Sequence, residues 1–204
     1  MTLADKVTSI RLILAPVFFI IYLFPGFFPS VFPPAAAGSL FNSALCTVSV
    51  LWILFIGSEI TDFLDGIIAR KSGEPSDFGK LFDPFADTLT QITYFLCFVI
   101  DGILSPLLLL FVLYREFSIL FIRNLMLKKG IAMGARIGGK IKTVTYILAG
   151  GLALLASSVN RLGFDKKLFK GLVIAAETAF FISVVIAIIS LFDYISVYAK
   201  TPKS

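Results

Sequence analysis

The acidic residues of this chain are concentrated in one stretch, which runs from Asp62 to Asp87 and reads DFLDGIIARKSGEPSDFGKLFDPFAD. Asp62 and Asp65 are three residues apart, so they share one face if the chain is helical there. Asp83 and Asp87 are four residues apart and share a face for the same reason. Converging carboxylates raise one another's pKa and need a counter-charge to stay ionised. Mg²⁺ supplies such a charge and is commonly held by a few carboxylates together with substrate phosphates. The spacing therefore predicts a metal site that handles phosphate.

Three residues near these aspartates suit a phosphate-bearing ligand. Gly66 has no Cβ, so a ligand can approach the backbone closely there. Arg70 offers a planar fork that matches phosphate oxygens, although a basic residue at this place could also serve as an anchor at the membrane surface. Ser76 lies in a connection marked by glycine and proline, where it could contact the ligand or face water.

Four basic residues stand within or beside apolar segments further along: Arg115, Arg123, Lys140 and Lys142. Arg115 and Arg123 are eight residues apart, near two helical turns, and so lie roughly on one face. Charges inside apolar helices imply an anionic ligand or a buried ion pair. Glu116 follows Arg115 directly, and adjacent residues do not face each other on a helix, so we expect Glu116 to be a poor partner. An anion-binding role is therefore favoured for these cations.

The composition indicates an integral membrane protein. Of the 204 residues, 58% are hydrophobic and 15% are charged, whereas soluble domains carry about 25% charged residues. The chain has no histidine, which excludes a Ser-His-Asp triad and a zinc site with histidine ligands. Any general base must be a carboxylate, lysine, tyrosine or cysteine.

Apolar runs long enough to cross a bilayer, about 20 residues each, recur along the whole chain. We expect an all-α, six-transmembrane-helix bundle that forms a single catalytic domain over residues 1–204. A cleavable signal peptide is the competing interpretation of the first run, because Lys6 and Arg11 precede it. The expected spans are roughly 8–25, 41–63, 78–100, 106–127, 139–157 and 171–198.

The basic residues predict the orientation. If the aspartates face the cytoplasm, 14 of the 18 lysines and arginines fall on that side or in that half of the membrane. The other four lie in the loop around 161–170, where they could contact anionic lipid headgroups. Because cytoplasmic loops carry an excess of lysine and arginine, we expect both termini and the aspartate site to lie on the cytoplasmic side of the inner membrane.

The acidic stretch also resembles a known family. Its pattern, Asp62-x2-Asp65-Gly66-x2-Ala69-Arg70-x8-Gly79-x3-Asp83-x3-Asp87, is similar to the signature of the CDP-alcohol phosphotransferase family at every fixed position. The resemblance implies a six-helix membrane bundle, commonly a homodimer. It also implies that the four aspartates of the pattern bind two Mg²⁺ ions, with Mn²⁺ as a possible substitute. Asp87 would in addition be the general base. The Gly66, Arg70 and Ser76 positions would hold the cytidine diphosphate part of a lipid donor.

The flanking segments resemble the phosphatidylglycerophosphate synthase branch of that family. They are KVTSIRLILAPVFF at 6–19, REFSILFIR at 115–123 and GGKIKT at 138–143. The chain departs from the branch at residues 3–6 and at Thr88, where lysine is frequent. The resemblance implies transfer of a phosphatidyl group from CDP-diacylglycerol to glycerol 3-phosphate, with CMP released. The four later cations would bind the phosphate of that acceptor.

Other functions are open at this stage. A phosphatidylinositol phosphate synthase would also need a basic pocket for a phosphorylated acceptor. A cholinephosphotransferase fits less well, because quaternary ammonium groups prefer aromatic faces to arginines. From a different class, carboxylates could line the path of a divalent-cation transporter. Gly66 and Arg70 favour the enzyme, since a cation pathway has little use for an arginine beside its acids.

Overall fold

Six α-helices make up almost all of the computed structural model, which describes residues 3–27, 39–71, 77–131 and 136–201. No strand occurs in those ranges, so the expectation of an all-α fold is confirmed. Each of the six predicted apolar segments falls inside one helix. The helices are α1 (Leu3–Phe27), α2 (Ser39–Lys71), α3 (Asp77–Ile100), α4 (Pro106–Lys128), α5 (Ile137–Arg161) and α6 (Lys166–Lys200).

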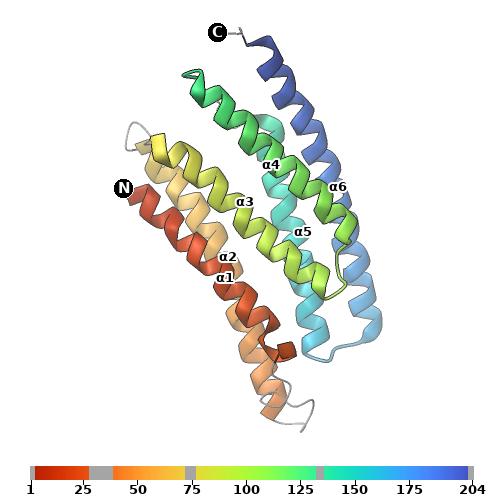
Figure 1. Ribbon diagram of the computed structural model, residues 1–204. Helices are drawn as coiled ribbons and strands as arrows, with labels where there is room; N and C mark the ends of the chain where they lie inside the picture. Colours follow the sequence, from red (N-terminus) through yellow and green to blue (C-terminus); the bar gives the residue numbers. More distant parts are fainter. Residues whose placement is uncertain (1–2, 28–38, 72–76, 132–135, 202–204) are drawn as a thin grey trace.

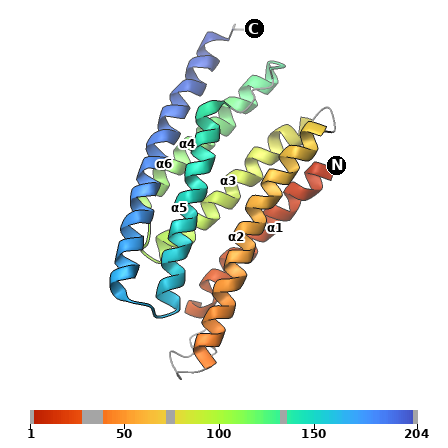
Figure 2. The ribbon, with the colours of Figure 1, turned by 180° about the vertical axis from the view of Figure 1, so that it is seen from behind.

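The helices run alternately up and down in an elongated bundle (Figure 1). The start of α1, the end of α2, the start of α3, the end of α4 and the end of α6 all lie toward one end, which we call the site end. The turn from α3 to α4 and the loop from α5 to α6 lie at the other end. α1 packs against α2 and α3, and α6 packs along α5 and against α4, as the reverse view also shows (Figure 2).

Aromatic side chains from several helices form the centre of the core. The Phe95 ring of α3 contacts Tyr146 of α5 and Phe180 of α6, with ring centroids 5.2 and 4.6 Å away. Gly150 of α5 allows the Phe55 ring of α2 to pack closely, because a Cβ at Gly150 would lie only 3.3 Å from that ring. The core thus fixes α2, α3, α5 and α6 relative to one another, and these helices carry the residues of the site described below.

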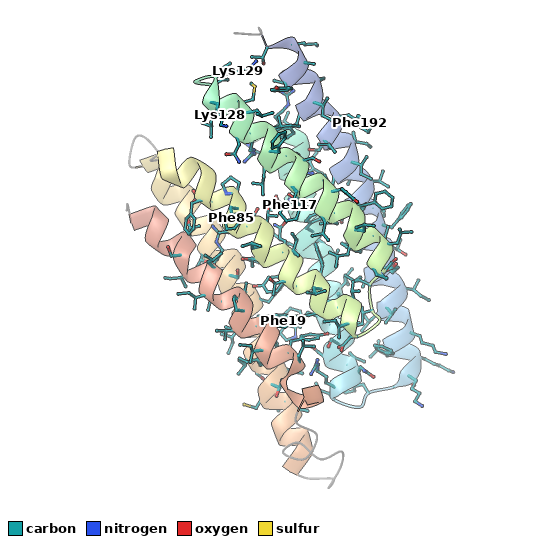
Figure 3. All side chains as sticks on the ribbon, viewed as in Figure 1. Phe19, Phe85, Phe117, Lys128, Lys129 and Phe192 are labelled. Carbon is teal, nitrogen blue, oxygen red and sulfur yellow. The ribbon has the colours of Figure 1, made fainter. Side chains whose placement is uncertain are left out.

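The outer faces of the bundle are apolar. Large side chains such as Phe192 and Phe117 are 66% and 52% exposed, and Phe192 projects away from the neighbouring helices in Figure 3. Contiguous apolar surface of this kind marks a membrane or protein interaction site. Three stretches are long and apolar enough to cross a bilayer, namely Ala44–Asp62, Ile137–Arg161 and Lys166–Lys200, and Thr8–Leu23 is a shorter apolar helix. The protein is therefore a membrane protein.

A bilayer crossing by all six helices stays a prediction. α3 and α4 do not meet the same criterion of length and apolarity within the described residues. Each of them carries four charged residues. Several of these charges line the cavity at the site end, so the same residues that weaken the membrane signal supply the chemistry.

Candidate active site

A cavity of about 230 Å³ opens between α2, α3, α4, α5 and α6 near the site end. Its lining includes carboxylates from α2 and α3, which we call the acidic wall, and cations from α4 and α5, which we call the basic wall. The structure thus brings seven of the predicted site residues to one space. They are Asp62, Asp83, Asp87, Arg115, Arg123, Lys140 and Lys142.

The acidic wall is formed where α2 ends and α3 begins. α2 continues as a helix to Lys71, beyond the predicted limit at residue 63. Asp62, Asp65, Gly66 and Arg70 are therefore all helical positions, and Asp62 is the one whose side chain the structure describes. The side chains of Asp65 and Arg70 lie outside the described part, as does Ser76 as a whole. Their predicted roles stay predictions.

α1 supplies polar partners to the carboxylates that the sequence did not lead us to expect. The Arg11 side chain is 2% exposed. Its Nη1 donates to Asp62 Oδ1 and lies 3.9 Å from Asp87 Oδ1. Thr8, three residues earlier on the same helix face, donates from Oγ1 to Asp83 Oδ1 at 2.7 Å. Arg11 thus provides counter-charge to both helices of the acidic wall.

The carboxylates fit a hard divalent cation in their donor chemistry. Three of them border one cavity, and carboxylate oxygens are the ligands that Mg²⁺ takes in phosphate-handling sites. Among the side chains that the structure describes, no three acidic, histidine or cysteine groups approach closely enough to form a metal cluster. Asp65, the fourth predicted ligand, is not among those side chains.

Glu116 pairs with Arg115, contrary to the expectation from the sequence. Arg115 Nη1 donates to both carboxylate oxygens of Glu116, at 2.9 and 2.8 Å, so the expectation that these adjacent residues would not pair is wrong. Each side chain is only 5% exposed. A buried charge without a partner costs several kcal/mol, and the long arginine side chain can bend to reach its neighbour. Arg115 also donates to Ala187 O and Ser190 Oγ of α6, at 3.3 and 3.1 Å.

Lys142 joins this carboxylate to the acidic wall. Its Nζ donates to Glu116 Oε1 at 3.0 Å and to Gln91 Oε1 at 3.3 Å. Gln91 in turn donates from Nε2 to Asp87 Oδ1 at 3.0 Å. The ammonium also lies 4.5 Å from the centroid of the Tyr146 ring, a favourable cation–π position. Lys142, Gln91 and Glu116 are all buried.

Arg123 and Lys140 make fewer side-chain hydrogen bonds than Arg115 within the described part of the chain. Arg123 Nη2 donates to the Tyr194 hydroxyl at 3.1 Å, and its guanidinium lies 5.6 Å from the Tyr194 ring centroid. Arg123 Nε is buried and has no hydrogen-bond partner among the described residues. Lys140 is exposed and lines the cavity. Glu116 carries one negative charge beside two cations, Arg115 and Lys142. The basic wall therefore keeps a net positive charge, which suits an anion.

Comparison with known proteins supports the resemblance read from the motif. A family model described as CDP-alcohol phosphatidyltransferase matches residues 1–191. A CDP-diacylglycerol–glycerol-3-phosphate 3-phosphatidyltransferase of Treponema pallidum is 38% identical over 97% of this chain and 89% of its own length. The protein of the same name from Bacillus subtilis is 29% identical over 95% of this chain and 93% of its own. A probable phosphatidylglycerophosphate synthase of Mycobacterium tuberculosis is 30% identical over 76% of this chain and 67% of its own length. This chain belongs to the CDP-alcohol phosphatidyltransferase family.

Proposed function

We propose that this protein transfers the phosphatidyl group of CDP-diacylglycerol to sn-glycerol 3-phosphate and releases CMP, a step of phospholipid biosynthesis. One observation carries the proposal: the acidic wall and the basic wall line the same cavity. A reaction that joins a nucleotide-linked lipid to a phosphorylated alcohol needs both walls. The printed names of the Treponema and Bacillus relatives describe this reaction for those proteins.

In the proposed mechanism, the acceptor hydroxyl attacks the phosphorus that bears the diacylglycerol. A new P–O bond forms, the bond from that phosphorus to the CMP oxygen breaks, and the hydroxyl proton passes to Asp87. Gly66, Arg70 and Ser76 would hold the nucleotide part of the donor. Asp62, Asp65, Asp83 and Asp87 would hold divalent cations, most simply two Mg²⁺ with Mn²⁺ as a substitute. When bound, such ions would offset charge on the diphosphate and on the departing phosphate.

The acceptor's own phosphate would lie against the basic wall. Arg123 and Lys140 have hydrogen-bond donors to spare, and Lys142 borders the same space. Arg115 adds positive charge, but its contacts with Glu116 and α6 occupy most of its donors. The observed pairing therefore ranks Arg123 above Arg115 as a direct phosphate ligand.

Replacing Arg123 by glutamine is expected to raise the KM for glycerol 3-phosphate by about 10- to 100-fold, the equivalent of a charged hydrogen bond of about 1.5–3 kcal/mol. The KM for CDP-diacylglycerol should change little. Arg136→Gln is the matched control, because Arg136 is also an arginine paired with α6, through Asp193, and does not line the cavity. Steady-state kinetics of both variants check this. Equal effects of the two substitutions would contradict the assignment.

Removal of divalent cations with a chelator is expected to abolish CMP release, and added Mg²⁺ or Mn²⁺ should restore it. The reason is that the carboxylates would otherwise repel the donor diphosphate, because Arg11 offsets only part of their negative charge. A second readout is independent of turnover: CDP-diacylglycerol should raise the thermal unfolding midpoint in detergent only when Mg²⁺ is present. Full activity after exhaustive chelation would overturn the proposed cation requirement.

The proposed site faces the cytoplasm, in the inner membrane, and the whole chain acts as one catalytic domain. The support is the excess of lysine and arginine at the site end, where Lys128 and Lys129 end α4 (Figure 3). We also propose a homodimer, on the strength of the family resemblance. The exposed apolar faces of the bundle leave room for such a contact.

The experiment that tests the proposed function uses purified protein in detergent with CDP-diacylglycerol and labelled glycerol 3-phosphate. The expected result is labelled phosphatidylglycerophosphate, with an equal amount of CMP. Inositol phosphate, added as a competitor, should inhibit weakly. CMP release that is as fast with free glycerol or serine would contradict the acceptor assignment, because neither molecule offers a phosphate to the basic wall.

A further inference from the structure

We propose that Gln91 is a positioning residue that connects the acceptor-binding lysine, Lys142, to the reacting carboxylate, Asp87. The inference rests on the proposed function, because it assigns Asp87 and Lys142 the roles given above. Gln91 was not among the residues that the sequence pointed to, and it does not line the cavity itself. It stands behind the acidic wall and acts through its neighbours.

The two halves of the Gln91 amide contact opposite partners. Nε2 donates to Asp87 Oδ1 at 3.0 Å, and Oε1 accepts from Lys142 Nζ at 3.3 Å. Only one orientation of the amide satisfies both contacts, since a carboxylate can only accept and an ammonium can only donate. A glutamine paired with an aspartate four residues earlier is an ordinary feature of a helix surface. The contact from Lys142, 51 residues away on α5, makes this pair a bridge between helices.

Burial makes the bridge rigid. Gln91, Lys142 and Glu116 are 6%, 4% and 4% exposed. Inside a protein such contacts are stronger than in water, and breaking one leaves a polar group without a partner. The contacts described for Asp87 both involve Oδ1, which accepts from Gln91 and lies 3.9 Å from Arg11 Nη1. Fixing Oδ1 restricts rotation of the carboxylate and leaves the second oxygen for the two partners proposed above, the divalent cation and the acceptor hydroxyl.

Lys142 has one donor left for substrate. An ammonium carries three N–H donors, and two of them go to Glu116 and Gln91. Lys142 borders the cavity, and its third donor would serve an acceptor phosphate bound there. Lys142, which would bind the acceptor, is thus linked through one side chain to Asp87, which would take the acceptor's proton. That side chain is Gln91, and it sets the distance between Lys142 and Asp87.

Two substitutions separate this role from simple packing. Gln91→Leu removes both contacts, whereas Gln91→Glu keeps an oxygen for Lys142 but replaces the donor to Asp87 with a repelling charge. In both variants kcat should fall about tenfold to a hundredfold, the cost of a misplaced reacting group. The KM for the acceptor should change by less than about threefold, because loss of positioning acts on the transition state. Thr90→Val is the control: Thr90 is buried beside Gln91, and the one side-chain hydrogen bond seen for it within the described part of the chain goes to Ala86 O of its own helix, at 2.9 Å.

The variants are compared with the wild type for kcat, KM and thermal unfolding midpoint. Loss of kcat at an unchanged unfolding midpoint supports the bridge. A second supporting result is that Lys142→Met lowers kcat less in the Gln91→Leu variant than in the wild type. An unchanged kcat in Gln91→Glu, or strictly additive effects of the two substitutions, overturns it. The wild type is first tested with several acceptors. Activity with an acceptor other than glycerol 3-phosphate would refute the proposed substrate, and the Gln91 comparison is then made on that acceptor.

Discussion

Asp87→Asn should lower kcat by about 10²- to 10⁴-fold, the contribution of a well-placed general base. An amide cannot take the acceptor proton and is a weaker cation ligand than a carboxylate. The bond from Gln91 can re-form to the amide oxygen, so the fold should be kept. The measurement is CMP release by the purified variant, with the thermal unfolding midpoint recorded in the same detergent.

Asp165→Asn is the matched control for that substitution. Asp165 is the N-cap of α6 and accepts from Lys167 N at 3.2 Å, at the end of the bundle away from the cavity. Asparagine is as good an N-cap as aspartate, so neither activity nor stability should change. An Asp87→Asn protein that turns over at the wild-type rate would show that the proton passes to another group.

Glu116→Leu should cause the largest loss of stability among the substitutions considered. It leaves Arg115 and Lys142 buried without their shared carboxylate. Breaking a buried pair by removing one partner costs about 3–5 kcal/mol. For a chain of this size that corresponds to a fall of about 10 °C in the unfolding midpoint, which can be measured in detergent.

The double variant Arg115→Met/Glu116→Leu tests the physical reason. It removes one of the stranded cations together with the carboxylate, and replacing both members of a buried pair with apolar groups is often neutral. Stability should therefore recover in part, limited by Lys142, which has Gln91 as its remaining partner. A double variant less stable than Glu116→Leu alone would contradict the pairing seen in the structure.

The helices and the acidic wall could be predicted because their signals are local. Apolar runs fix where each helix lies, and the spacing of Asp83 and Asp87 places both on one face of α3. The prediction that carboxylates and cations share a space followed from the family resemblance, and the cavity contains members of both sets. The limits of α2 were less accurate, because an apolar pattern stops where the polar residues of a site begin although the helix continues to Lys71.

The partners of those residues could not be predicted because they come from distant helices. Arg11 meets Asp62 across 51 positions, and Thr8 meets Asp83 across 75. Nothing in a single sequence says that α1 packs beside α2 and α3. A polar pair three residues apart, Thr8 and Arg11, at the start of an apolar helix was the one available signal.

The error at Glu116 has a different cause. The rule that adjacent helix residues diverge holds for the Cβ directions and for exposed side chains. It fails where both charges are buried at a helix interface, because leaving either one unpaired costs more than bending a long side chain. Burial of Arg115 and Glu116 against α6 depends on tertiary packing, which the spacing of the residues does not reveal.

The proposed function requires that carboxylates of α2 and α3 together hold divalent cations around the donor nucleotide. Crystals grown with Mn²⁺ and CDP-diacylglycerol would locate these cations through the anomalous scattering of manganese. We expect anomalous peaks against Asp62, Asp83 and Asp87, with the cytidine diphosphate bound to the same ions. Nucleotide density in the cavity with no peak beside these carboxylates, or peaks confined to other parts of the protein, would contradict it.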